Sequence, residues 1–159
     1  MAKLQDLGKI VLSTINSKAV LSVAGEEAVR SIQTRTRTGK GVTEANGSPT
    51  KLPKLKPKTV ANRRSAKNTG KATSEFFSPK KSNLTLTGQM IESVSHKAIN
   101  GEVSIILNND EAKRKAGEVL KVDPRYEFMN LSKAEVTRMV RVITAEVTAI
   151  LRKINFTGF

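Results

Sequence analysis

The stretch SKAEVTRMVRVITAEVTAILRKI, residues 132–154, predicts the most secure helix of the chain, on which a β-hairpin is expected to pack. It begins with a capping box, in which the Ser132 hydroxyl accepts from the Glu135 amide while the Glu135 carboxylate reaches back to the helix start. Apolar residues then recur every three or four positions for about five turns, which is typical of an amphipathic helix. They are Val136, Met139, Val140, Ile143, Val147, Ile150, Leu151 and Ile154. We therefore expect a long C-terminal helix.

A β-hairpin and two shorter helices are predicted before this helix. Strands at residues 95–99 and 102–107 flank Asn100-Gly101, which is the preferred two-residue hairpin turn. The second strand is rich in β-branched residues, as strands usually are. Residues 88–94 indicate a short helix that leads into the hairpin, and residues 108–120 indicate a charged helix that follows it. We expect the hairpin to pack on the long C-terminal helix.

The N-terminal part of the chain predicts two further helical stretches. The first carries an apolar stripe formed by Leu4, Leu7, Ile10, Val11 and Ile15. The second covers residues 20–32 and has an apolar face formed by Leu21, Ala24, Ala28 and Ile32. Gly39 and Gly41 are expected to end it. One bent helix is an alternative, because residues 16–18 break a helix only weakly.

A strongly basic tract lies between these helices and the hairpin. Residues 30–81 hold fourteen Lys and Arg against two acidic residues, which leaves +12 of the chain's formal +14 charge. Four prolines and many Gly, Ser, Thr and Lys residues remove any regular periodicity from residues 42–82, so this segment is expected to be a loop or arm. A short helix is plausible at residues 58–64, with Pro57 near its first position.

Length and composition suit one domain of the α+β class. We expect residues 1–159 to form a single domain, within the usual range of roughly 100 to 200 residues, from which residues 40–82 project as a basic arm. The core must be aliphatic, because the chain has five Phe, one Tyr and no Trp. It has no Cys, no secretion signal at its start and no apolar run near the roughly 20 residues that cross a bilayer. We expect a soluble cytoplasmic protein.

No group of residues predicts catalysis or a bound metal or cofactor. His96 is the only histidine, and we expect it on the exposed side of a hairpin strand, since no Ser, Cys or carboxylate constellation gives it a catalytic role. Thr38-Gly39-Lys40-Gly41 lacks the earlier glycine and the following hydroxyl of a phosphate-binding loop. Adjacent acids such as Asp110-Glu111 do not face the same way on a helix. The expected protein is not an enzyme.

The basic arm has three interpretations that the residues alone leave open. It can contact phosphates without reading bases, because it offers few aromatic platforms for stacking. It can dock on an acidic neighbouring subunit, or it can be a solvated arm that maintains solubility. The candidate contact residues are Lys51, Lys54, Lys56, Lys58, Arg63, Arg64, Phe76 and Phe77. Of these, Phe76-Phe77 could pin the arm into a hydrophobic groove.

Three short segments also follow one another in an informative order. PKLKPKT at residues 53–59 is followed by Arg63-Arg64, LTLTGQMIES spans residues 84–93, and PRYEFMNLS spans residues 124–132. They resemble the Pro-Leu-x-Pro-x-Thr, Leu-x-x-Thr-Gly-x-Leu-x-x-Ser and Arg-Pro-Phe-Leu-like segments of the virion morphogenesis family of tailed bacteriophages. Members of this family are tail-completion or neck proteins, which join the portal assembly of the head to the tail.

The resemblance implies an α+β subunit without enzymatic activity that forms a closed homo-oligomeric ring around the DNA channel. The implied partners are a portal, adaptor or head-completion protein and a tail-tube or tail-terminator protein, with the packaged DNA backbone within reach of the arm. No membrane is implied. The implied location is the neck or tail of a virion that is assembled in the host cytoplasm. The alternative function is sequence-independent nucleic-acid binding through the basic arm.

Residues of the matched segments also have expected packing roles. We expect the short helix to begin at Thr87-Gly88 and to pack residues 90–94 onto the C-terminal helix. The later segment flanks the start of that helix and is expected to fix its angle against the hairpin. The structural residues of the motifs are Thr87, Gly88, Pro124, Phe128 and Leu131.

Overall fold

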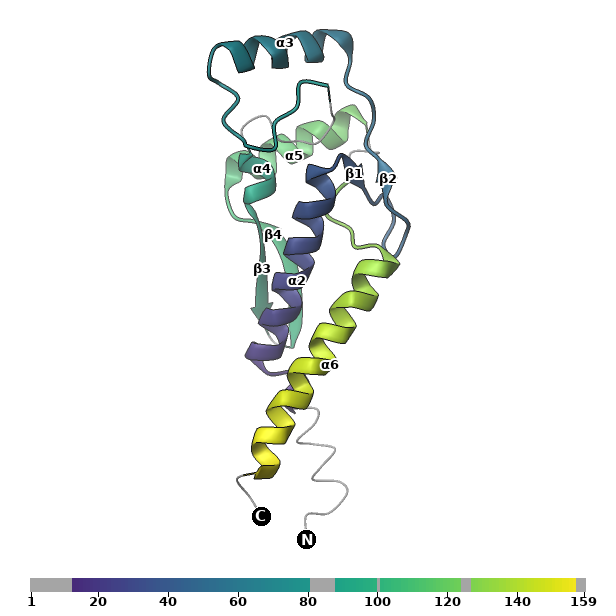
Figure 1. Ribbon diagram of the computed structural model, residues 1–159, viewed down its shortest axis with the longest axis vertical. Coiled ribbons are helices and arrows are strands. Elements are labelled where there is room, and N and C mark those ends of the chain that lie inside the picture. The colour runs from purple at the N-terminus through teal and green to yellow at the C-terminus, as the bar shows by residue number, and fades with distance from the viewer. Residues whose placement is uncertain (1–12, 81–87, 100, 124–126, 157–159) are drawn as a thin grey trace.

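Helices and two small antiparallel sheets make up the fold, which confirms the predicted α+β class (Figure 1). The computed structural model describes residues 13–80, 88–99, 101–123 and 127–156. The helices are α2 (Lys18–Arg37), α3 (Pro57–Asn68), α4 (Gln89–Glu92), α5 (Asp110–Val122) and α6 (Lys133–Phe156). The strands are β1 (Lys40–Gly41), β2 (Thr50–Lys51), β3 (Val94–Ile99) and β4 (Glu102–Leu107). The first predicted helix lies almost wholly outside the described residues.

Helix α2 is the central element of the molecule. It packs on α6 along one side and on the β3–β4 hairpin along another (Figure 1). The hairpin therefore lies on α2, whereas the sequence predicted that it packs on the C-terminal helix. Small residues allow the close approach, because Ala24, Gly25 and Ala28 of α2 are all buried. A methyl group at Gly25 would come within 2.3 Å of the His96 ring on β3.

Nearby residues explain where α2 begins and where it ends. Ser17 has an extended backbone, and its side chain accepts from the Val20 amide at 3.4 Å, so it caps the helix and excludes one bent helix through residues 16–18. Gly39 ends the helix as predicted, with a φ of 81° that favours glycine. Gly41 does not end it. This residue lies in β1, where a methyl group would come within 2.3 Å of the Glu127 carbonyl oxygen.

The predicted hairpin is confirmed, and its first strand begins one residue earlier than expected, at Val94. Ile99 pairs with Glu102 across the tight turn, where Gly101 has a φ of 81°. His96 pairs with Ile105, and the His96 ring faces α2, where its Nε2 lies 3.2 Å from the Ser22 hydroxyl. The prediction of an exposed His96 is wrong, because the side of β3 that carries it is the side covered by α2.

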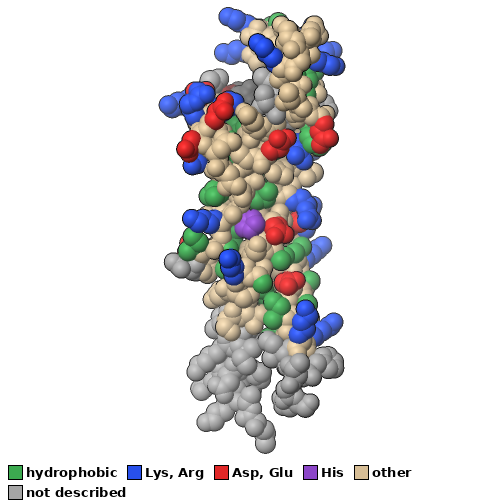
Figure 2. Space-filling model, turned by 90° about the vertical axis from the view of Figure 1, so that its left-hand side faces the viewer, with side chains coloured by type: hydrophobic (Ala, Val, Ile, Leu, Met, Phe, Trp, Pro, Cys, Tyr) green, Lys and Arg blue, Asp and Glu red, His purple; other side chains and the backbone are tan. Residues whose placement is uncertain are grey.

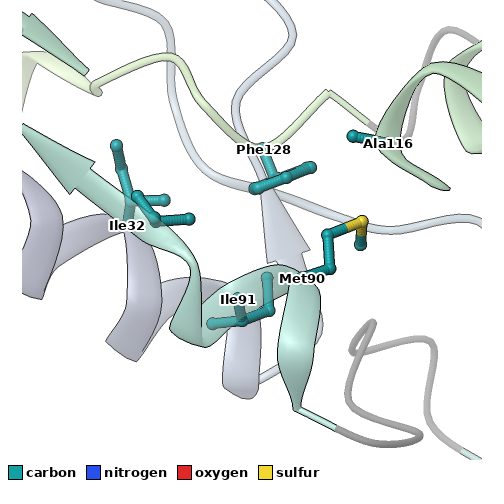
Figure 3. Close-up of a cluster of buried hydrophobic side chains, with 6 residues drawn as sticks. Ile32, Met90, Ile91, Ala116 and Phe128 are labelled. Atoms are coloured by element: carbon teal, nitrogen blue, oxygen red, sulfur yellow. The ribbon is translucent and has the colours of Figure 1, made fainter. Parts of the chain in front are cut away.

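The main apolar cluster lies where α2, α4, α5 and the hairpin meet (Figure 3). Its buried members are Ile32, Met90, Ile91, Val94, Ala116 and Phe128. Residues 90–94 are buried as expected, but α4 packs on α5, α2 and β3 rather than on the C-terminal helix. The reason is that α2 occupies the position next to the hairpin that α6 was expected to fill.

The two helices after the hairpin begin as the sequence predicts. The Asn109 side chain caps α5 by accepting from the Ala112 amide at 2.6 Å. Ser132 and Glu135 form the predicted capping box at the start of α6. The Ser132 hydroxyl accepts from the Glu135 amide at 3.3 Å, and a Glu135 carboxylate oxygen accepts from the Ser132 amide at 2.7 Å.

Candidate interaction surfaces

The first part of the predicted arm is held in the body of the molecule, by which we mean all described residues except 53–80. Strands β1 and β2 pair with each other, and Val42 and Leu52 are buried. The Asn46 amide donates to the Leu131 carbonyl at 2.9 Å, which ties this loop to the segment before α6. The part of the arm that extends away from the body therefore begins after Leu52, and we call residues 53–80 the distal arm.

The distal arm contains a complete helix rather than an irregular loop. Pro57 stands at the first position of α3, where its missing amide hydrogen costs nothing. Gly70 follows the last turn with a φ of 71°. The Gly70 amide donates to the Lys67 carbonyl at 3.2 Å and the Lys71 amide to the Ala66 carbonyl at 2.8 Å, which together form a Schellman motif. The predicted helix is confirmed and extends to Asn68, four residues further than expected.

Two cation–π contacts fold the distal arm back on itself and onto the body. The Arg37 guanidinium, at the end of α2, lies 4.1 Å from the centre of the Phe76 ring. The Arg63 guanidinium, on α3, lies 5.2 Å from the centre of the Phe77 ring. Both distances fall within the roughly 6 Å over which a cation attracts an aromatic face. Phe76 and Phe77 thus fix the arm within its own chain, whereas the sequence suggested a groove.

The predicted cationic contacts separate into two kinds. Arg63 is buried, with 6% of its surface exposed. Four lysines and Arg64 are exposed: Lys51, Lys54, Lys56, Lys58 and Arg64. Figure 2 shows Lys and Arg side chains on several sides of the end of the molecule formed by α3, while the Asp and Glu side chains visible in that view lie below it. Arg63 and Arg64 are adjacent in sequence, but only Arg64 faces solvent.

A buried charged network, which was not predicted from the sequence, joins α2 to the start of α6. Arg35 Nη1 donates to Glu135 Oε2 at 2.5 Å, and its Nη2 donates to the carbonyls of Phe128 at 2.5 Å and Asn130 at 2.9 Å. Burial lowers the pKa of Arg35 from its ordinary value, and the Glu135 carboxylate opposes that shift. The same carboxylate caps α6, so one side chain fixes both the helix start and its position on α2.

The apolar stripe of α6 is only partly covered. Among the α6 residues whose side chains are described, none of the apolar ones is buried. Val140 leaves 52% of its surface exposed, and Val136, Met139, Ile143, Val147, Ile150 and Leu151 are half-buried. The reason is that α2 packs on α6 from one side, so the stripe is wider than the surface that covers it.

The remaining motif residues lie in the core or outside the described residues. Phe128 is buried in the main cluster, and Leu131 packs partly buried against it together with Ile105 and Leu107 of β4. Gly88 precedes α4 with a φ of 79°. Thr87 and Pro124 lie outside the described residues.

Within the described ranges, no three His, Cys, Asp or Glu side chains gather in a way that could hold a metal ion. The helices of those ranges include none that is both long and apolar enough to cross a membrane. No protein-family model, curated protein or solved structure matched the chain. The residues and their geometry therefore carry the functional inference.

Proposed function

We propose that this chain is a structural virion protein of a tailed bacteriophage, a subunit of a homo-oligomeric ring that joins the head to the tail. In this neck or tail-completion role, the ring lies between a portal, adaptor or head-completion protein and a tail-tube or tail-terminator protein. The subunit works by binding and has no catalytic role. The order of the three family-like segments supports this assignment, and the partly covered stripe of α6, with Val140 exposed, is the observation that carries it.

The α6 stripe fits a second copy of the chain. Residues 136–154 make about five turns and a stripe roughly 28 Å long, on which no described apolar residue is buried. Burying the apolar surface that the stripe leaves exposed is favourable, and Val140 is the most exposed of its described residues. With +14 per chain, copies repel one another at long range, so a lasting contact between them needs apolar surface of this kind.

The hairpin supports a head-to-tail arrangement of subunits. Within the described residues, β3 and β4 pair only with each other, so each strand has one edge without a strand partner. Open edges are surfaces on which another chain can add. When one surface of a subunit binds a different surface of the next, the contacts close into a ring if the rotation divides a circle.

The assignment is tested by placing a charge in the stripe. Val140→Asp is expected to abolish rings seen by negative-stain imaging and native mass spectrometry, because the carboxylate would be buried at the subunit contact. The matched control is Ala145→Asp, which introduces the same side chain on the exposed side of α6 and should keep the rings. Circular dichroism should show unchanged helix content in both variants.

Two results would contradict the ring assignment. One is a wild-type chain that remains strictly monomeric and does not enter mature virions. The other is a Val140→Asp variant that assembles as the wild type does.

A further inference from the structure

Helix α3 has an outward side of small residues with a cation on each flank. Ala61, Ser65 and Asn68 are spaced four and three positions apart, so they lie on one face, and all three are exposed. Lys58 and Arg64 lie to either side of this strip and are exposed as well. Small side chains in the middle allow close approach of another surface. The flanking cations attract a surface that is negatively charged.

The opposite side of α3 holds the helix in place. Val60, Arg63 and Ala66 are covered, three positions apart, and Arg63 lies over the Phe77 ring. With Pro57 at its first position and a Schellman motif at its end, α3 presents the exposed cations on a formed helix rather than on a flexible tail. A ligand therefore pays less ordering entropy than it would on binding a disordered basic segment.

A second copy of the chain is a poor partner for this surface. Five acidic residues already form ion pairs with cations of their own chain: Glu27, Asp110, Glu111, Glu118 and Glu135. Helix α3 has four cations and no acidic residue, so copies of it repel one another. The charge of the surface favours a dense external polyanion over another copy of α3.

Each phenylalanine of the arm has one of its two ring faces occupied by an arginine, which leaves at most one face for a base. Single-strand binders place successive bases on aromatic faces. Here one face of Phe76 is covered by the Arg37 guanidinium and one face of Phe77 by that of Arg63. The exposed chemistry of α3 is therefore cationic, which suits phosphates rather than bases.

We infer that the outward side of α3, with Lys58 and Arg64 as its flanks, binds the phosphate backbone of duplex DNA. Residues 58–68 span about 15 Å of helix, and the same length of duplex carries about nine phosphate charges. Ser65 and Asn68 on the strip carry hydrogen-bonding groups, so the expectation that binding is independent of sequence rests on phosphate contacts by Lys58 and Arg64 and is tested with two unrelated duplexes. The site belongs to a single chain, and it goes beyond the proposed ring without depending on it.

The test compares two double variants that remove equal charge from different helices. Binding to fluorescent duplexes of about 30 base pairs, in two unrelated sequences, is followed by anisotropy over a salt series. Lys58→Ala/Arg64→Ala is expected to weaken binding about ten- to hundredfold at 0.1 M salt and to reduce the slope of log K against log [salt] by about two. The control, Lys113→Ala/Arg114→Ala, removes two exposed cations of α5 and should leave the slope unchanged.

Three results would overturn this site. The first is an equal loss of affinity in both double variants, since net charge alone would then explain binding. The second is tighter binding of single-stranded than duplex DNA that is lost in Phe76→Ala, because bases would then be the ligand. The third is displacement of DNA by polyglutamate as effectively as by unlabelled duplex of equal charge. Imaging of rings is scored separately, so a monomeric wild-type chain that passes the DNA test contradicts only the ring.

Discussion

Arg35 in the body and Arg63 in the distal arm are buried to the same extent, with 6% of each residue exposed. Their partners lie at very different separations along the chain. Arg35 bonds Glu135, one hundred residues away, and thereby joins α2 to α6. Arg63 lies over Phe77, fourteen positions away, and this contact joins two parts of the arm. Equal burial thus serves two purposes: one arginine holds the whole fold together, and the other shapes a local unit that can open by itself.

The largest expected effect comes from removing each arginine in turn. Arg35→Ala leaves Glu135 buried without its cation, so it should lower the free energy of unfolding by about 3–5 kcal/mol. Arg63→Ala should change that global value by less, about 2 kcal/mol, which is the worth of a desolvated cation–π contact. Urea denaturation followed by circular dichroism measures both. Faster amide exchange confined to α3 in Arg63→Ala would sharpen the comparison, and an equal global loss in the two variants would break it.

A smaller effect is expected at two glycines, one in each region. Gly25→Ala places a methyl group 2.3 Å from the His96 ring, so overpacking should cost about 1–3 kcal/mol of global stability. Gly70→Ala meets no neighbour, but its φ of 71° should cost about 1–2 kcal/mol at the end of α3. This second loss should appear as fraying of α3 in amide exchange, with little change in the global unfolding midpoint.

The glycine prediction has an internal control. Replacing His96 by Ala removes the ring that the added methyl group would strike, so Gly25→Ala should cost less in that background. A Gly25→Ala variant as stable as the wild type would show that α2 and β3 do not approach as closely as described.

The smallest effect concerns ion pairs within single turns of α5. The pKa of Asp110 lies below its ordinary value of 3.8, first because Lys113 donates a hydrogen bond to it and then because of the charge of Lys113. A lowered folded-state pKa adds stability above the unfolded value that is lost as pH falls through the folded one, so this pair weakens only below about pH 3.8. Lys113→Ala should raise the pKa of Asp110 in an NMR titration, whereas Lys121→Ala should leave it in place.

Turns and helix starts that depend on residues close together in the sequence were predicted correctly. The Asn100-Gly101 turn, the Asn109 cap and the Ser132–Glu135 capping box all depend on residues within a few positions of one another. Helix α3 was found through Pro57 but predicted too short, and Gly70 was the available signal for its true end. Strands β1 and β2 were missed because two residues are too few to show a periodicity.

The arrangement of these elements was predicted less well, since it depends on contacts far apart in sequence. Helix α2 was given one apolar face, yet it buries small and polar residues on two sides, including Ser31 and Arg35. Because small and polar residues do not indicate burial, the sequence pattern did not predict that α2 is the central helix. The difference in burial between Arg63 and Arg64 could have been predicted from the helical periodicity. Val60, Arg63 and Ala66 lie on the covered side of α3, and Arg64 does not.

Glu135 has a consequence for how the molecule is made. Its carboxylate accepts from the Ser132 amide that begins α6 and from Arg35 at the end of α2. Formation of this bond has to wait until synthesis has passed residue 135, so a nascent chain on the ribosome holds Arg35 without its counter-ion. Docking of the late helix and neutralisation of the early arginine are then one cooperative event, which makes the fold close as a unit.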